Sequence, residues 1–217
     1  MKRFEEAELA GVYRAIYERR DMRHFLPDPV APAILQRLLD AAHHAPSVGF
    51  MQPWRIVRIT DRALRIALHD IVECERQLTA EALGERGAAF MKLKVEGMLE
   101  CGELLVAALM GERESHIFGR RTLPEMDLAS VACAIQNLWL AARAEGLGMG
   151  WVSLFEPSAV RALLKMPDDS NPVAILCLGH VECFYDKPML EQENWAKRAP
   201  LANCLFENTW GQPLPSL

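Results

Sequence analysis

The sequence predicts a single α+β domain in which buried strands are mixed with long helices. Apolar residues recur at helical spacing in several segments, whereas shorter apolar or alternating runs lie between glycines and prolines. No internal repeat or low-complexity segment is present. A chain of 217 residues with 51% hydrophobic and 24% charged residues suits one globular domain whose core needs no stabilising disulfide or metal.

The first hundred residues predict two helices, one strand and a further helical stretch. Prolines bound the second helix, and an alternating run after a proline-bearing loop is typical of a strand. The helical stretch that follows is charged and glycine-punctuated near its middle. The expected bounds are residues 5–19 and Pro32 to near Pro46 for the helices, 54–60 for the strand, and 61–100 for the mostly helical stretch.

The rest of the chain predicts a buried strand, a strongly apolar central helix and two more buried strands. Residues 111–126 are polar and long for a connection, so they are a candidate lid, as are residues 81–90. The tail, residues 183–217, has aromatic residues but little periodicity, which would suit wrapping around a partner subunit. The expected bounds are 103–110 for the first strand, 127–145 for the helix, and 151–155 and 173–181 for the later strands.

Charge and hydropathy exclude several classes of protein. The net charge of −5 gives no support to nucleic-acid or membrane-surface binding. The first residues contain no apolar stretch typical of a secretion signal, and 18 uncharged apolar residues never run together. We therefore expect a cytoplasmic protein without a membrane-spanning helix.

Cysteine and histidine spacing predicts neither a disulfide framework nor a metal site. The six cysteines form no C-x-x-C pair and mostly lie in apolar runs, which favours reduced thiols in the core. His43 and His44 have no acidic or cysteine partner at ligand spacing, so no metal is expected.

Five residues after the first helix, Arg19-Arg20-Asp21-Met22-Arg23, form a local cluster of cations in an acidic protein. Arginine forks match phosphate oxygens in charge and geometry, so an anion site is expected here. The alternative is a solvated helix end, with arginines near the negative end of the helix dipole. A helix end does not need the acidic Asp21, and this favours the anion site.

Two loops contain residue types that suit a flat heterocycle. The segment 45–54 places Ser47, Gly49 and Gln52 between a helix and a strand, where a hydroxyl, an open backbone and an amide are available. An ordinary connection is the alternative. The segment 145–153, Glu-Gly-Leu-Gly-Met-Gly-Trp-Val-Ser, precedes a strand and lacks the G-x-G-x-x-G spacing of a dinucleotide site.

Together these segments resemble the FMN-binding nitroreductase superfamily, and within it the family of 5,6-dimethylbenzimidazole synthases. The similarity spans nearly the whole chain and is weakest in residues 70–92 and 111–124. The segments that carry it are 19–23, the long loop 45–54, the helical segment 136–146, the strand segment 150–153, and Trp195 with 198–201 in the tail.

The resemblance implies a nitroreductase-like fold: a central mixed or antiparallel sheet flanked by helices, in a homodimer whose tail wraps the partner subunit. It also implies two FMN sites at the subunit interface. Reduced FMN is then a substrate, fragmented with O2 to 5,6-dimethylbenzimidazole with release of erythrose 4-phosphate. NAD(P)H would act only indirectly, through a separate flavin reductase.

By the same resemblance, Asp21 is the expected base at the ribityl chain, where ordinary nitroreductases usually have serine, and arginines nearby should keep it ionised. Ser153 is expected to donate a hydrogen bond near the flavin N5 and to direct the reaction with oxygen. A structural ion pair for Asp21 and a buried strand serine for Ser153 are the alternatives. The expected flavin contacts are Arg19, Arg20, Asp21, Met22, Arg23, Ser47, Gly49, Gln52, Lys94, Gly150, Ser153 and Arg198.

Two other functions share this site. An NAD(P)H-dependent nitroreductase or flavin reductase would use the same FMN and dimer, and a non-catalytic flavin carrier would bind FMN without chemistry. Neither requires an acid at the position of Asp21.

Overall fold

A computed structural model of the protein describes residues 3–214. The chain divides into two compact units, Met1–Phe184 and Tyr185–Leu217. The division falls close to the start of the expected tail at residue 183. We describe each unit by itself.

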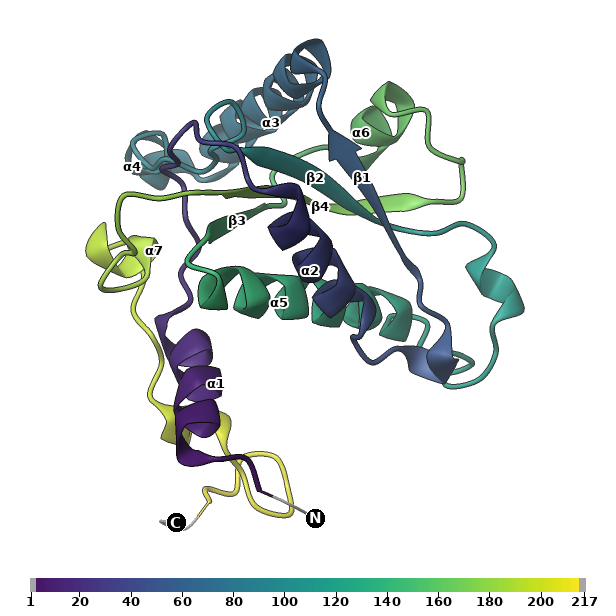
Figure 1. Ribbon diagram of the computed structural model, residues 1–217, viewed down its shortest axis with the longest axis vertical. Helices are drawn as coiled ribbons and strands as arrows, with labels where there is room; N and C mark the ends of the chain where they lie inside the picture. The colour runs from purple at the N-terminus through teal and green to yellow at the C-terminus, as the bar shows by residue number, and fades with distance from the viewer. Residues whose placement is uncertain (1–2, 215–217) are drawn as a thin grey trace. The chain divides into compact units, whose positions relative to one another are not determined.

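The centre of the first unit is a four-stranded, wholly antiparallel sheet with the order β1-β2-β4-β3 (Figure 1). The α+β fold is therefore confirmed. Because β2 and β4 are the inner strands, they are buried on both faces, and all seven residues of β2 are buried. The strands are β1 (Trp54–Ile59), β2 (Glu103–Leu109), β3 (Gly148–Val152) and β4 (Asn171–Gly179).

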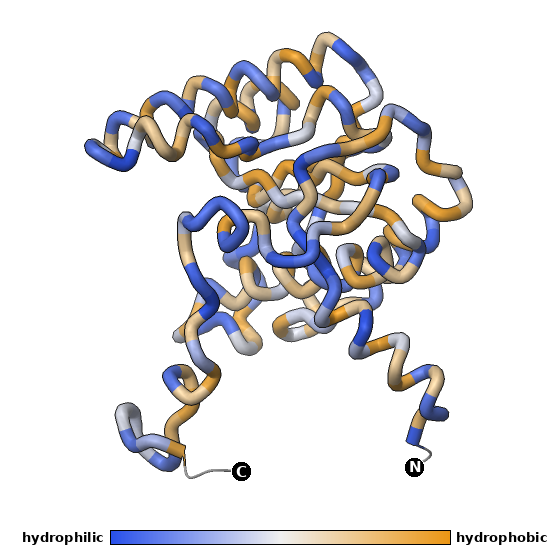
Figure 2. Tube along the Cα trace, turned by 90° about the vertical axis from the view of Figure 1, so that its left-hand side faces the viewer, coloured by the Kyte–Doolittle hydropathy of each residue, from blue (hydrophilic) through white to orange (hydrophobic). Residues whose placement is uncertain are grey.

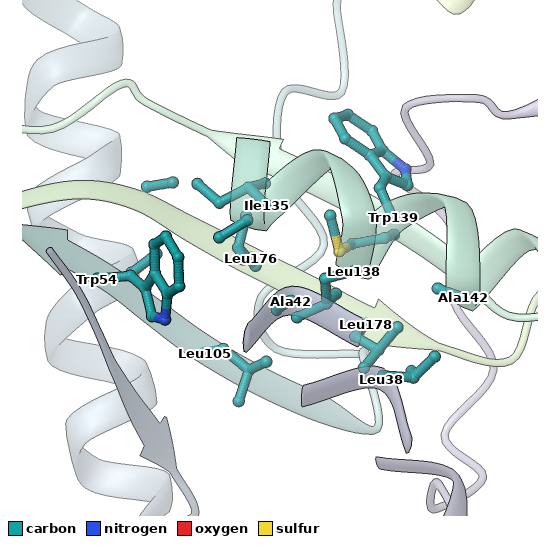
Figure 3. Packing of buried hydrophobic residues seen from close by; sticks show 14 of the residues in the cluster. Leu38, Ala42, Trp54, Leu105, Ile135, Leu138, Trp139, Ala142, Leu176 and Leu178 are labelled. Carbon is teal, nitrogen blue, oxygen red and sulfur yellow. The ribbon is translucent and has the colours of Figure 1, made fainter. Parts of the chain in front are cut away.

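One face of the sheet is covered by α2 (Pro32–His43) and α5 (Met126–Ala144). Alternate residues of the inner strands, such as Leu105 and Leu176, point into this layer (Figure 3). They meet Leu138 of α5, which is fully buried. Each such leucine contributes about 1.5–3 kcal/mol by leaving water. This apolar layer fixes α5 across the sheet, and α5 positions much of the candidate site.

The other face carries α3 (Arg62–Ala82) and α6 (Pro157–Leu163). The intervening residues of β2, Leu104 and Val106, pack there in a second cluster with residues of both helices. Because successive side chains of a strand point to opposite faces of the sheet, β2 contributes to two separate hydrophobic clusters.

Helix α1 (Glu6–Glu18) begins with a capping box between Glu5 and Glu8 and has no buried residue. It contacts α5, yet apolar side chains such as Tyr13 and Tyr17 are 52% and 70% exposed. Figure 2 shows apolar and polar residues interspersed along the helix near the N-terminus. The helix was expected from its apolar spacing, and that spacing leaves an uncovered apolar face.

The largest differences from the expected elements are two wrong bounds and one missed helix. The third strand begins at Gly148 and not at residue 151, because its glycines pair with β4 despite their low strand propensity. Helix α6 was missed; Pro157 at its first position and the Glu156 cap initiate it. The stretch 61–100 is helical only to Ala82 and again in α4 (Gly87–Phe90), with irregular backbone after it.

The second unit contains α7 (Met189–Gln192) and a bridge between Phe206 and Pro213. The rings of Phe206 and Trp210 lie 5.1 Å apart, and Trp210 is 93% exposed.

Throughout the chain the six cysteines are free, but only Cys101 and Cys177 are buried. The expectation of core thiols was therefore wrong for the other four. Among residues 3–214, none of the helices is both long and apolar enough to cross a membrane.

Candidate active site

The arginine-rich segment after α1 lies along the edge of β3. Arg19 has extended backbone angles (φ −58°, ψ 134°), which end the helix at Glu18. Asp21 then forms a parallel bridge with Met149, and the Met22 N–H donates to the Met149 carbonyl at 3.0 Å. The segment is therefore neither a solvated helix end nor a free loop, because it is held on the sheet.

Two glycines of β3 make this close approach possible. A Cβ at Gly150 would lie 2.3 Å from the Met22 carbonyl oxygen and 2.6 Å from Arg23 Nη1. A Cβ at Gly148 would lie 3.0 Å from Met22 Cγ. A side chain at Gly150 would push residues 21–23 off the strand, and one at Gly148 would crowd Met22 and Val181, whose Cγ1 would lie 2.5 Å away. The Gly-x-Gly pattern is thus explained by contact with the chain itself.

The Asp21 carboxylate is held at two points, by the backbone of β3 and by Arg23. Its Oδ1 accepts from the Trp151 N–H at 3.0 Å, and its Oδ2 accepts from Arg23 Nη2 at 2.7 Å. The same Nη2 donates to the Trp151 carbonyl at 2.9 Å. The Arg23 side chain is 9% exposed and that of Asp21 is 43% exposed. The carboxylate is therefore oriented but still reaches the surface.

Burial raises the pKa of Asp21 above its ordinary value, against the lowering effects of Arg23, the Trp151 N–H and Arg19. We expected the arginines to dominate, and the direction is the reverse. Desolvation dominates because the carboxylate is packed between the strand and Arg23. A carboxylate with a raised pKa is a stronger base.

Trp139 of α5 organises the other two arginines, and sequence reasoning missed it. The Arg19 guanidinium lies 4.4 Å from the centroid of the Trp139 ring, and Trp139 Nε1 donates to the Arg20 carbonyl at 3.3 Å. Arg20 Nη1 donates to the Tyr17 carbonyl at 2.8 Å. The Trp139 ring also lies 6.4 Å from that of Trp151. In the sequence, a tryptophan on the inner face of an apolar helix predicts only core packing and does not indicate contact with the arginines.

We call these residues, Arg19–Arg23 with Trp139, Gly150 and Trp151, the Asp21 cluster.

A second group, the Ser47 loop (residues 47–52), lies near the start of α5. Ser47 Oγ accepts from the Gln52 N–H at 3.1 Å, and the Val48 N–H donates to Ser130 Oγ at 3.0 Å. Gly49, Phe50 and Gln52 have positive φ angles of 52°, 54° and 51°. Such angles are unusual for the two residues that are not glycine, so the loop depends on its surroundings for this shape.

Gly49 faces the candidate lid segment. A Cβ at Gly49 would lie 2.8 Å from the Phe118 carbonyl oxygen. We expected this glycine to leave room above a flavin ring; instead, residue 118 of the same chain occupies the space beside its Cα. Sequence spacing gave no sign of this contact.

The other expected flavin contacts differ in their surroundings. Ser153 is exposed and follows the end of β3, so the alternative of a buried strand serine is wrong. Lys94 Nζ forms an ion pair with Glu100 at 2.8 Å. The Met22 side chain is 1% exposed and belongs to the core. Arg198 is exposed and lies in the second unit.

Within one chain, the Asp21 cluster and the Ser47 loop attach to different ends of α5. The loop bonds to Ser130, near the start of the helix, and the cluster packs on Trp139. Nine residues of α-helix span about 14 Å at 1.5 Å per residue. A ligand that touches both groups must therefore be long, or must lie between two copies of the chain.

The fold and these segments define a member of a known class. Residues 16–180 match the Nitroreductase family, and the chain belongs to that family. In solved structures it is similar to nitroreductase A from Vibrio parahaemolyticus (TM-score 0.70, 22% identity, 93% of this chain and 77% of the other). It is also similar to an NADPH:FMN oxidoreductase from Vibrio harveyi (TM-score 0.69, 21% identity, 93% and 79%).

More similar in sequence are two proteins named 5,6-dimethylbenzimidazole synthase. The one from Rhodospirillum rubrum is 42% identical over 184 residues, which cover 84% of this chain and 87% of that protein. The one from Rhodobacter capsulatus is 38% identical over 199 residues, covering 91% and 96%. The resemblance inferred from the motifs is therefore confirmed. The family match and the named relatives also show that the chain is an oxidoreductase enzyme.

Proposed function

We propose that the protein fragments reduced FMN with O2 to form 5,6-dimethylbenzimidazole, with release of erythrose 4-phosphate. The observation that carries the proposal is the Asp21 carboxylate, oriented by Trp151 and Arg23 at a partly exposed position with a raised pKa. The relatives that bear the synthase name support the same reaction. A reaction that removes a proton from carbon needs such a base, whereas simple hydride transfer does not.

The residues present fit FMN. Its phosphate is an anion, and the adjacent Arg19 and Arg20 supply two guanidinium groups in a protein of net charge −5; the charge of Arg19 also acts on Asp21. Its ring is flat and has hydrogen-bonding edges, which the Ser47 loop can meet with backbone and amide groups. Related structures include a deiodinase bound to FMN, which supports the cofactor class.

We infer a homodimer in which each flavin site uses both groups, one from each chain. The separation of the Asp21 cluster and the Ser47 loop along α5 supports this arrangement. So do the uncovered apolar side chains of α1 and α5: Ile16 and Leu128 are 42% and 45% exposed. An apolar helix face is stable in water only when another surface covers it. Residues 183–217 would wrap the partner and bring Arg198 to the phosphate.

In this site reduced FMN supplies the ring and the electrons, and O2 is the oxidant. Asp21 accepts a proton from C1′ of the ribityl chain, while Arg23 and the Trp151 N–H hold the carboxylate in place. Arg19, Arg20 and Arg198 bind the phosphate, whose binding energy positions the ring end. Ser47, Gln52 and Lys94 contact the ring or the ribityl chain. Ser153 donates a hydrogen bond near N5. The protein works in the cytoplasm beside a separate flavin reductase.

A nitroreductase or flavin reductase is the second candidate, because the structural neighbours include an NADPH:FMN oxidoreductase. In such an enzyme one FMN cycles indefinitely and a nicotinamide must reach the ring. In a flavin-cleaving enzyme the FMN is consumed. A carrier would leave FMN intact.

The FMN balance during aerobic turnover tests the proposal. We expect the purified protein with NAD(P)H and oxidised FMN to oxidise nicotinamide very slowly. Adding a separate flavin reductase should start benzimidazole formation, with about one product per FMN lost, as the fragmentation requires. The reductase alone is the control. Fast NAD(P)H oxidation by the protein with an undiminished FMN pool would refute the proposal.

A further inference from the structure

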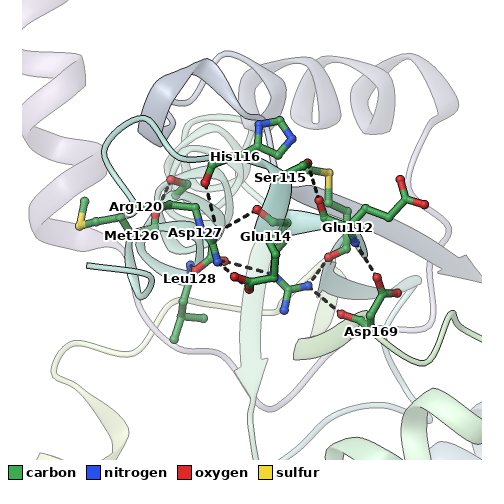
Figure 4. A network of polar contacts seen from close by, with 12 residues as sticks. Glu112, Glu114, Ser115, His116, Arg120, Met126, Asp127, Leu128 and Asp169 are labelled. Atoms are coloured by element: carbon green, nitrogen blue, oxygen red, sulfur yellow. Dashed lines mark hydrogen bonds and ion pairs between the residues drawn. The ribbon is translucent and has the colours of Figure 1, made fainter. Parts of the chain in front are cut away.

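A buried ionic cluster ties the segment 111–126 to the first turn of α5 (Figure 4). The Asp127 Oδ2 accepts from Arg113 Nε at 3.1 Å and lies 3.2 Å from Arg120 Nη2. Arg120 and Asp127 are only 6% and 5% exposed. We call these three residues the Asp127 cluster. The buried carboxylate of Asp127 therefore lies between two guanidinium groups, and the exposed Glu114 is a second acidic partner of Arg120.

Each arginine of the Asp127 cluster also donates to backbone carbonyls, either within the segment or beside it. Arg113 Nη1 donates to the carbonyls of Met110 and Asp169, the second at 2.9 Å. Arg120 Nη1 donates to the carbonyls of Arg113 and His116, at 2.8 and 3.2 Å. The segment has little regular structure of its own, so these bonds take the place of a helix or strand ladder. Its order depends on the arginines, and their burial depends on Asp127.

The far side of the segment packs on the Ser47 loop. The Phe118 carbonyl oxygen would lie 2.8 Å from a Cβ at Gly49, and a Cβ at Gly119 would lie 2.6 Å from Val48 Cγ2. Val48 is also bonded to Ser130 of α5, whose hydroxyl donates to the Met126 carbonyl at 2.6 Å. The loop is therefore held between α5 and residues 118–119.

We propose that Asp127 is a positioning residue for the flavin site: it fixes residues 111–126 as a wall that holds the Ser47 loop in its positive-φ shape. Its effect on flavin chemistry rests on the proposed function, but its effect on the loop does not. The segment 111–126 is then a fixed support and not a mobile lid.

Removing the charge of Asp127 tests whether this residue positions the Ser47 loop or only packs against its own neighbours. Asp127→Asn removes the buried carboxylate between the two arginines: Arg113 loses its ion pair with Asp127, and Arg120 retains the exposed Glu114 as an acidic partner. Loss of one partner of a buried ion pair is strongly destabilising. Glu114→Gln is the matched control, because Glu114 contacts the same Arg120 Nη2 at 3.1 Å but its side chain is 91% exposed. Because the Glu114 carboxylate stays in water, we expect its pair with Arg120 to contribute less than the buried pair with Asp127.

The experiment is amide hydrogen exchange of the flavin-free, full-length protein, followed by steady-state kinetics with reduced FMN. In Asp127→Asn we expect peptides 47–53 and 113–123 to exchange together, at least about tenfold faster, while peptides of β2 and β4 stay unchanged. The Michaelis constant for reduced FMN should rise more than kcat falls, since the chemical groups of the Asp21 cluster are intact. Glu114→Gln should match the native protein in both measurements.

Faster exchange in 113–123 with unchanged exchange in 47–53 would overturn the inference, as would equal effects of the two variants. If Asp127→Asn does not fold, Arg113→Lys keeps a cation beside Asp127 while losing the planar fork, and it should show the same coupled exchange to a smaller degree. A native protein that forms no benzimidazole would refute the proposed function, yet the exchange result would still decide the role of Asp127.

Discussion

Gly150→Ala tests whether contact between residues 21–23 and β3 builds the candidate site. The added Cβ would lie 2.3 Å from the Met22 carbonyl oxygen, so the segment must move by about 1 Å to restore an ordinary contact. That shift weakens the Met22 to Met149 bond and the Trp151 to Asp21 bond, both 3.0 Å long. Overpacking costs about 1–3 kcal/mol and the two weakened bonds about 1–2 kcal/mol more, so we expect a loss of about 3 kcal/mol.

For a chain of this length such a loss lowers the melting temperature by roughly 10 °C. Calorimetry measures the melting temperature, and quenching of flavin fluorescence measures FMN binding, which should weaken in parallel. Gly11→Ala is the control: no atom lies within 4 Å of its added Cβ, and alanine favours the helix. A Gly150→Ala protein that melts within about 2 °C of the native one and binds FMN normally would refute this reasoning.

Four further outcomes are expected. Asp21→Asn should abolish benzimidazole formation, measured by product analysis, while FMN affinity stays within several-fold; normal product yield would remove Asp21 as the base. Folding raises the pKa of Asp21, so the folded protein holds this proton more tightly than the unfolded chain does. Below the unfolded value of 3.8 the group is protonated in both states and costs no stability; as pH rises through the folded pKa, its ionisation destabilises the folded protein. The native protein should therefore lose stability relative to Asp21→Asn as pH rises above about 3.8, and a constant difference in the free energy of unfolding would contradict the raised pKa. Ser153→Gly should retain flavin binding but accumulate oxidised FMN and hydrogen peroxide; unchanged product and peroxide would make Ser153 merely structural. Deleting residues 185–217 should abolish FMN binding and weaken self-association in analytical ultracentrifugation, and a dimeric truncated protein that binds FMN normally would show that the tail is dispensable.

Hydrophobic periodicity was enough to predict the helices and inner strands that build the core. The regular spacing of residues 127–145 predicted α5 to within a residue or two. The strand β3 was misplaced because two of its first three residues are glycines, which are chosen here for contact with Met22 and not for strand propensity. That contact belongs to the tertiary structure, which a local sequence pattern does not predict.

The candidate site was predictable where side-chain chemistry was unusual for its context. Asp21 among arginines was recognisable from the sequence, and the structure brings it together with Gly150. The partners Trp139 and Asp127 were not recognisable, because a tryptophan in an apolar helix and an aspartate in a first helical turn are common. The pKa of Asp21 was misjudged for a related reason: burial depends on the whole fold, whereas neighbouring charges can be read from the chain.

The contact between Asp21 and Trp151 also has a consequence for solubility. β3 is an edge strand, and the unpaired N–H groups of an edge invite pairing with strands of other molecules. Here the edge is occupied by the chain itself: Met22 bonds to Met149, and a carboxylate oxygen accepts from the Trp151 N–H where a neighbouring strand would otherwise bind. The group that we propose as the base thus also blocks intermolecular β-pairing. Replacement of Asp21 by a residue without a side-chain acceptor would open this edge to aggregation, whereas asparagine, which retains a carbonyl oxygen, would keep it closed.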